Sequence, residues 1–239
     1  MDKTKLLDRA AKSGEERLLL ARVLDKLEQA QSRSIPAATD FLSAQERASA
    51  EVLLRLAGVG ETEYVSLGGY EGAERRILLF LPDWMQPEAG LEHSPLRCLR
   101  AKYRPEYDLS HRDILGSLMG MGITREKTGD ILVGKESCDL IVSEGVAEFL
   151  LQSWNQAGRA KLSVSAISPE ELSAPEERFE EVRDTVMSLR LDAVAATGFK
   201  LARGKAAALI ESGRVQVNWL ECAKPDRLLA EGDTVSARG

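Results

Sequence analysis

The chain has few of the residues that build metal sites and disulfide frameworks, with two histidines and three cysteines among 239 residues. Cys98, Cys138 and Cys222 are odd in number and far apart. Neither the ligand spacing of a zinc site nor a set of paired half-cystines can be recognised in them. This usage predicts a protein of the reducing cytoplasm, and we expect no metal and no other cofactor.

Long apolar runs are also missing. No window approaches the roughly 18 uninterrupted apolar residues that indicate a membrane-spanning helix, and the first twenty residues carry charges instead of the apolar segment of a secretory signal. These absences predict no membrane partner.

At 44% hydrophobic and 29% charged residues, the chain can bury cores and is not disordered as a whole. The net charge of −6 argues against a chain coated in nucleic acid, but it allows a local basic patch because charge acts over about 8–10 Å.

Residues 1–60 are predicted to form a helical segment. Apolar residues recur at helical spacing over residues 3–31 and 43–57. The second helix is expected to begin at the capping box Ser43–Glu46 and to end at Gly58.

The apolar period changes at residue 61. Two strand patterns around Gly68, Gly69 and Gly72 predict a hairpin, and strand and helix patterns alternate from there to residue 167. This order predicts an α+β fold of the plait kind over 61–167, an α/β sandwich with helices on one face of a sheet. Residues 168–181 are rich in Pro, Ser and Glu and predict a linker, which leaves 182–239 as a small C-terminal domain.

This last domain carries the strongest signal. "SLRLDAVAATG" and "KLARGKAAALIESGRVQVNW" predict a helix, a turn, a second helix ended by Gly213, and a strand. Residues 190–219 hold five cations and two acids, a net charge of +3. Several of the cations fall around one helix start, where unpaired N–H groups also attract anions. The candidate RNA-binding residues here are Arg190, Lys200, Arg203, Lys205, Arg214 and Asn218.

A second group of candidates lies in the middle of the chain. "RCLRAKYR", residues 97–104, holds four cations, one tyrosine and no acid, so it could present phosphate contacts and one stacking ring on a strand. A solvated edge strand protected by its charge is the alternative. His111 and Arg112 open the next expected helix, where they could touch phosphate; the alternative for His111 is a helix N-terminal or core-edge residue without contact to RNA. The candidates of this group are Arg97, Arg100, Lys102, Arg104, His111 and Arg112.

The pattern "RLD…G…ARGKA…LIESGRVQVN…EGD" is similar to the RNA-binding domain named after the fourth protein of the small ribosomal subunit, also called the alpha-L motif. The matching positions are Arg190, Leu191, Asp192, Arg203, Lys205, Ala206, Ile210, Gly213, Val215, Val217, Asn218, Gly232 and Asp233. Two positions depart from it, because Ala202 and Gly204 stand where the family usually has serine. The lost hydroxyls, worth about 1 kcal/mol each, predict a weaker hold on RNA than the family norm.

"HRDILGSLMGMGITREKTGDILV", residues 111–133, resembles the signature of the bacterial YlmH-type proteins, which carry this C-terminal domain. The resemblance implies a non-catalytic protein that binds structured ribosomal RNA on the large ribosomal subunit, with tRNA as a further candidate partner. It also implies a role in ribosome quality control or the rescue of obstructed subunits, with no small-molecule substrate. An adaptor linked to cell division is one alternative.

Two patterns could indicate catalysis. "GDILVGK", from Gly129 to Lys135, has the spacing of a phosphate-binding loop, but Glu136 follows where Ser or Thr is needed and "DILV" predicts a strand. "RLDAVAATG" resembles a stretch of pseudouridine synthases whose aspartate is the nucleophile, and an RNA-modifying enzyme of that kind is the second alternative. Here the spacing from Asp192 to Thr197 and Gly198 is one residue too long. We therefore interpret Asp192 as an acid at a helix start that pairs with a nearby cation or favours the helix dipole.

Overall fold

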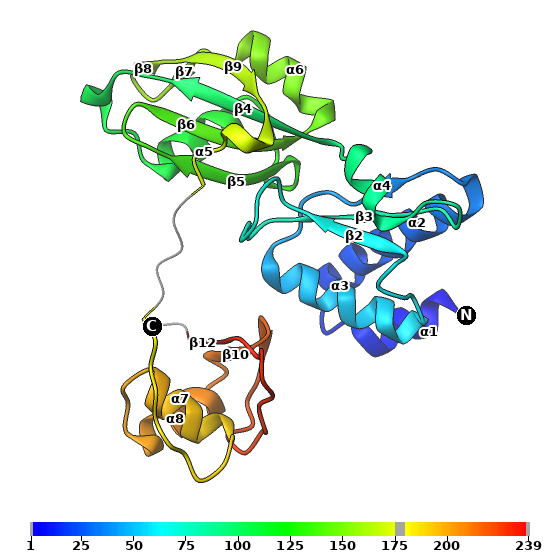
Figure 1. Ribbon diagram of the computed structural model, residues 1–239, viewed down its shortest axis with the longest axis vertical. Coiled ribbons are helices and arrows are strands. Elements are labelled where there is room, and N and C mark those ends of the chain that lie inside the picture. The colour runs from blue at the N-terminus through cyan, green and yellow to red at the C-terminus, as the bar shows by residue number, and fades with distance from the viewer. Residues whose placement is uncertain (1, 175–179, 238–239) are drawn as a thin grey trace. The chain divides into compact units, whose positions relative to one another are not determined.

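A computed structural model of the protein describes residues 2–174 and 180–237 (Figure 1). The chain divides into two compact units, Met1–Glu176 and Glu177–Gly239, each with a hydrophobic core of its own. The boundary between the units falls inside the segment 168–181, of which residues 175–179 lie outside the described residues.

The first unit opens with four helices and a small sheet, which we call the helical lobe (residues 2–92). Its elements are α1 (Lys3–Ala10), α2 (Gly14–Arg33), β1 (Ala37–Ala38), α3 (Ala44–Ala57), β2 (Tyr64–Leu67), β3 (Ile77–Phe80) and α4 (Pro87–Glu92). The strands are antiparallel in the order β1-β3-β2. The core between helices and sheet contains the fully buried Leu20, Leu53, Leu78 and Phe80.

The helix predicted over residues 3–31 is two helices. Ser13 caps α2 by accepting a hydrogen bond from the Glu16 N–H at 3.1 Å, and the Glu16 carboxylate accepts one from the Lys12 N–H at 2.6 Å. Continuous apolar spacing hid this break, although a Ser-x-x-Glu pattern is typical of a helix start.

The helix predicted over residues 43–57 is confirmed as α3. Ser43 and Glu46 form the complete capping box, each side chain bonded to the other residue's N–H. Gly58 ends the helix in the left-handed conformation with φ 79°, which only a residue without Cβ adopts freely.

The predicted hairpin is present as β2 and β3, but it belongs to the helical lobe. β3 pairs with β1 on its far side, and Leu78 and Phe80 are buried by the helices. The sequence placed this hairpin in one domain with the strands that follow, over 61–167. Alternation along a strand predicts that one face is buried, but it does not indicate which element covers that face. Here the covering helices precede the strands in the chain.

The plait is confirmed and begins at β4; we call residues 96–174 the plait lobe. Its elements are β4 (Leu96–Lys102), η1 (Pro105–Tyr107), α5 (His111–Gly120), η2 (Arg125–Lys127), β5 (Thr128–Val133), β6 (Ser137–Ser143), α6 (Glu144–Ser153), β7 (Gln156–Ala157), β8 (Ala160–Lys161), β9 (Ser163–Ile167) and η3 (Pro169–Glu171). The strand order β5-β6-β4-β9, all antiparallel, is that of a β-α-β-β-α-β sandwich. One face buries its apolar side chains against α5 and α6, where Trp154 Nε1 also donates to Ser117 Oγ at 2.9 Å.

The other face of the plait packs partly on the helical lobe. Cys98 and Ile141 of the sheet form one cluster with Phe41 and Ile77 of the helical lobe. Gly129 allows this close approach, since a Cβ there would lie 2.7 Å from the Phe41 ring. The two lobes therefore share apolar contacts inside one unit.

Partly buried polar contacts reinforce this junction. The Arg75 guanidinium donates to the carbonyls of Phe41, Thr128 and Arg125 at 3.0–3.1 Å, and burial lowers the pKa of Arg75. Asp130 accepts hydrogen bonds from the Tyr70 hydroxyl at 2.9 Å and from the Arg75 N–H at 3.0 Å. The loop between β2 and β3 is thereby tied to β5.

The second unit is small and has the predicted order of elements. They are α7 (Leu191–Gly198), α8 (Arg203–Glu211), β10 (Val215–Val217), β11 (Leu220–Glu221) and β12 (Val235–Ala237), with strand order β11-β10-β12. Its core is formed by Leu191, Ala195, Ala206, Ile210, Val215, Val217, Cys222 and Leu229. Gly213 ends the turn after α8 with φ 72°, as expected.

Candidate nucleic-acid interface

The start of α8 is the centre of the predicted site. Arg203 and Lys205 lie in its first turn, and Ala202 occupies the cap position without a side-chain hydrogen bond to the helix. The first N–H groups of α8 therefore lack the side-chain acceptor that a serine would supply. Together with the positive end of the helix dipole they favour an anion at this point.

Arg203 and Arg190 converge on one carboxylate, that of Asp192 in the first turn of α7. Arg203 donates through Nε and Nη2 at 3.0–3.2 Å, and Arg190 through Nε and Nη2 at 3.1–3.2 Å. The Asp192 side chain is 8% exposed, whereas those of Arg190 and Arg203 are 38% and 59% exposed. We call these three residues the arginine clamp.

The arginines keep Asp192 ionised. Hydrogen bonds from Arg190, and then those from Arg203, lower the pKa of Asp192 against the opposing effect of burial. The prediction that Asp192 pairs with a nearby cation is confirmed. A nucleophile needs its carboxylate open to the substrate, so this arrangement is typical of a structural ion pair.

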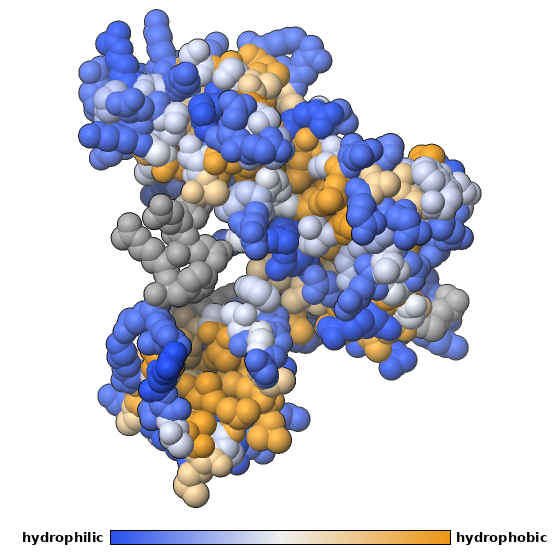
Figure 2. Space-filling model, viewed as in Figure 1, coloured by the Kyte–Doolittle hydropathy of each residue, from blue (hydrophilic) through white to orange (hydrophobic). Residues whose placement is uncertain are grey.

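Lys205 lies in the first turn of α8, and Arg214 lies beyond the end of this helix, directly before β10. Both side chains are exposed, and neither makes a hydrogen bond or ion pair with another described residue. With Leu201, Ala208, Leu209 and Ser212 they line a shallow depression of about 390 Å³. Hydrophobic side chains are exposed over part of this unit beside hydrophilic ones (Figure 2). These two cations are the most available of the domain's candidates.

Lys200 and Asn218 have partners inside the unit. Lys200 has a left-handed backbone (φ 54°) and pairs with Glu180 at 3.2 Å, both side chains being exposed. The Asn218 amide donates to Asp233 at 2.8 Å, and its oxygen accepts from the Thr234 N–H at 2.9 Å. Asn218 thus joins the turn after β10 to the loop before β12.

β4 does not present its three cations on one face. It is an inner strand between β6 and β9, so the edge-strand alternative is wrong. Arg97 lies on the helix side and pairs with Glu144 at the start of α6, whereas Arg100 and Lys102 point to the other face. Arg104, beyond the strand, lies 3.6 Å from Glu106.

Two further features of this segment differ from a phosphate-binding strand. Tyr103 is buried, and its hydroxyl donates to the Gly134 carbonyl at 2.7 Å, so it offers no stacking ring. Arg100 donates to both oxygens of Asp139 at 2.6 Å. Asp139 itself is 1% exposed and was not foreseen from the sequence, because 39 residues separate it from Arg100.

The side chains of Lys102, His111 and Arg112 are exposed and make no hydrogen bond or ion pair with the rest of the described chain. His111 and Arg112 open α5, whose capping box is formed by Ser110 and Asp113. The structure therefore brings two of the twelve candidates together as available cations at α8, and leaves three available on the plait lobe.

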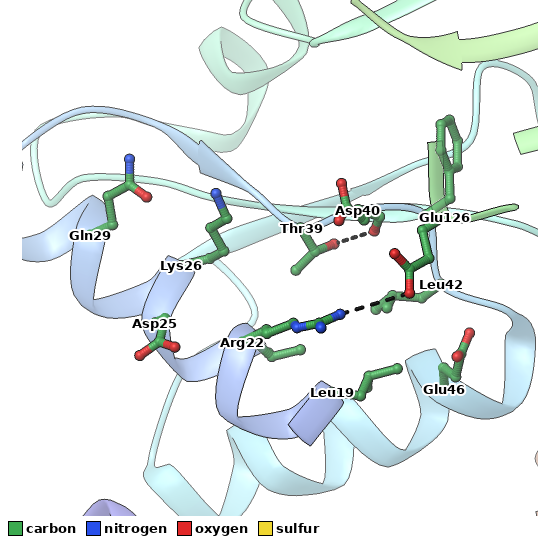
Figure 3. A pocket seen from close by; sticks show the side chains of 12 residues that line it. Leu19, Arg22, Asp25, Lys26, Gln29, Thr39, Asp40, Leu42, Glu46 and Glu126 are labelled. Carbon is green, nitrogen blue, oxygen red and sulfur yellow. Dashed lines mark hydrogen bonds and ion pairs between the residues drawn. The ribbon is translucent and has the colours of Figure 1, made fainter. Parts of the chain in front are cut away.

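A separate cavity of about 310 Å³ lies between α2 and the segment leading into α3 (Figure 3). Its lining includes the buried Val23, Phe41 and Leu42. Figure 3 shows Arg22 reaching across it to Glu126, at 3.7 Å. Asp40 pairs with Lys127. The rim charges therefore compensate one another and select no particular ligand.

The chemistry available elsewhere is limited. Within residues 2–174 and 180–237, no group of three or more His, Cys, Asp or Glu side chains could hold a metal ion, and no helix is long and apolar enough to cross a membrane. All three cysteines are buried, and burial raises the pKa of Cys98 to about 11 and that of Cys138 to about 12. The thiols of Cys98 and Cys138 are therefore protonated near neutral pH.

Three family models match separate segments of the chain. "YlmH, N-terminal" matches residues 15–83, "Putative RNA-binding domain in YlmH" matches 97–171, and "S4 domain" matches 189–235. The first match contains the β2–β3 hairpin, in agreement with its place in the helical lobe. The fold of the second unit and the match over 189–235 define the class of the protein as one that carries a C-terminal S4 domain.

A curated relative covers most of the chain. "Ribosome-associated protein quality control protein P2" of Bacillus subtilis (strain 168) is 36% identical over 202 residues, which are 84% of this chain and 77% of the relative. The chain belongs to the YlmH family, as the resemblance predicted. A solved structure, "Cell division protein ylmH from Streptococcus pneumoniae", shares the fold with a TM-score of 0.57 and 20% identity over 67% of this chain and 96% of that one.

Ala202→Ser should stabilise the second unit. Ala202 already has the extended backbone of a cap residue (φ −66°, ψ 141°), so a serine hydroxyl there can accept from an N–H of the first turn. We expect the free energy of unfolding to rise by about 1 kcal/mol, measured by thermal unfolding. Ala208→Ser, the same change at an exposed interior position of α8, is the control and should be slightly destabilising. Equal effects at the two positions would contradict the missing cap.

Proposed function

We propose that the protein binds structured ribosomal RNA on the large ribosomal subunit, with tRNA as a further contact, and acts in quality control of obstructed subunits. The observation that carries the proposal is the S4 domain, with its exposed cations around the start of α8. The name of the Bacillus subtilis relative supports the association with ribosomes. Such a protein works in the cytoplasm, where ribosomes are.

Phosphate contacts made through exposed lysine and arginine side chains suit structured RNA. The shape of a folded RNA and its phosphates can be read without aromatic platforms, in keeping with the low aromatic content of 5%. The local charge of +3 over residues 190–219 supplies the attraction that the acidic remainder of the chain does not.

We infer that the protein acts by binding and not by catalysis. The aspartate that a pseudouridine synthase would use corresponds to Asp192, which is nearly buried and holds two arginines. The cysteine thiols are buried as well. These observations support a binding role and leave the clamp free to serve RNA contact.

Sedimentation of the tagged protein with bacterial ribosomal subunits tests the proposal. We expect it in large-subunit fractions at low salt and its release as salt is raised, because phosphate contacts release counterions. Protein that stays at the top of the gradient, or that follows only the small subunit, would overturn the ribosomal assignment.

A further inference from the structure

The arginine clamp places a carboxylate in the middle of a basic surface. By charge alone, Asp192 opposes an anionic ligand, and its removal would make the surface more positive. Its position is nevertheless closely fixed. The Asp192 N–H donates to the Pro225 carbonyl at 2.9 Å, and the side chain lies in the first turn of α7 with 8% of its surface exposed. If Asp192 contributes to RNA binding, it must do so through the geometry of the two arginines that it holds.

Both arginines use the same edge for Asp192. Each donates through Nε and Nη2, and no described residue accepts from Nη1 of either one. Since the guanidinium is planar and carries five donors in a fixed fork, holding one edge also fixes the direction of the remaining donors. The exposed parts of Arg190 and Arg203 are therefore oriented before any ligand arrives.

We infer that Asp192 is a positioning residue, which holds Arg190 and Arg203 so that their Nη1 groups meet the RNA backbone. The inference rests on the proposed function and goes beyond it, because it makes a negative side chain necessary for binding a negative ligand. Long side chains lose rotamer freedom when they bind, and this loss is smaller where they are held in advance.

Asp192→Asn distinguishes positioning from charge by the direction of its effect. If charge alone mattered, removing the carboxylate would tighten binding of purified ribosomal RNA. Positioning predicts binding weaker by about tenfold, with a salt dependence shallower by about one phosphate contact or more. Affinity is measured by filter binding at a temperature where circular dichroism shows the variant folded. Equal or tighter binding by Asp192→Asn overturns the inference.

A cycle of variants separates positioning from a general loss of structure. In the background Arg190→Ala/Arg203→Ala, adding Asp192→Asn should cause no further loss of affinity, because the residues through which it acts are gone. A similar loss in both backgrounds contradicts positioning. If the double arginine variant binds like the wild type, the RNA-binding role of this surface fails, which is a different outcome from failure of the inference alone.

The double variant Arg190→Lys/Arg203→Lys tests the same inference if Asp192→Asn does not fold. Lysine preserves the charge but lacks the two-donor edge that Asp192 holds. We expect affinity to fall by about tenfold although the net charge is unchanged. Lysines that bind as tightly as the arginines would show that charge suffices.

Discussion

Arg100→Ala is expected to lower the free energy of unfolding of the first unit by about 3–5 kcal/mol, although Arg100 stands among the RNA-binding candidates. Its guanidinium donates to both oxygens of the buried Asp139 at 2.6 Å, and the Ser173 N–H donates to the same carboxylate at 2.7 Å. Removing the arginine leaves a charge inside the sheet without its counter-ion. Urea unfolding followed by circular dichroism measures the loss.

Lys102→Ala is the matched control, because Lys102 lies on the same face of the same strand but is exposed. It should change stability by no more than about 0.5 kcal/mol. We expect the folded Arg100→Ala protein to bind ribosomal RNA like the wild type, since the donors of Arg100 are used inside the unit. A stable variant with weakened RNA binding would reverse this assignment and make Arg100 an RNA contact.

The effect of Arg100→Ala should depend on pH. Burial tends to raise the pKa of Asp139, but hydrogen bonds from Arg100 and Ser173 bring it below its ordinary value. A carboxyl group with a depressed folded-state pKa stabilises the fold above its unfolded pKa of about 4, and this contribution is lost as the pH falls through the folded value. Without Arg100 the buried carboxylate favours protonation instead. The difference in the free energy of unfolding between wild type and variant should therefore become smaller as the pH falls from 7 towards 4. A difference that does not change with pH would indicate that Arg100 acts through packing.

Local patterns predicted the second unit well. Helix spacing, the turn at Gly213 and the alternation of Val215 and Val217 each depend on near neighbours, and all are present. The pairing of Asp192 with a nearby cation was also predicted, since Asp192 opens a helix and lies two residues from Arg190 and eleven from Arg203. Because these residues are close in sequence, the pairing of Asp192 could be predicted.

The middle of the chain was harder because its contacts are distant in sequence. The period of two along a strand already separates Arg97 from Arg100, and this signal was overlooked in favour of the count of four cations. The carboxylates that bind them, Glu144 and Asp139, lie 47 and 39 residues away. Nothing local indicates such partners, so availability for RNA could not be judged from charge alone.

The same limit applied to the hairpin. Residues 64–80 have the alternation of a sheet, which the sequence assigned to the strands that follow. Their covering helices precede them by up to some 60 residues, and the choice between the two neighbours depends on packing that no short window contains. The element type was predictable, but the layer to which it belongs was not.

Lys205→Glu/Arg214→Glu is expected to have the largest effect on RNA binding, weakening it by roughly 100-fold, about tenfold for each lost charged contact. These side chains line one depression along α8, and no described residue makes a hydrogen bond or ion pair with either of them. The two arginines of the clamp share one carboxylate, so Lys205 and Arg214 carry most of the uncompensated charge that phosphates would meet. Filter binding to purified ribosomal RNA over a salt series measures the affinity.

The slope of log affinity against log salt should become shallower by about two units, because two phosphate contacts are lost. Arg9→Glu/Lys12→Glu makes the same change in total charge on the helical lobe, where both side chains are exposed. This control keeps the net charge equal while leaving the S4 domain intact, so it should bind RNA far more tightly than the α8 variant. If the two variants lose affinity to the same extent, overall charge governs binding. If neither does, the contact surface lies elsewhere, with Lys102 and Arg112 of the plait lobe as the next residues to reverse.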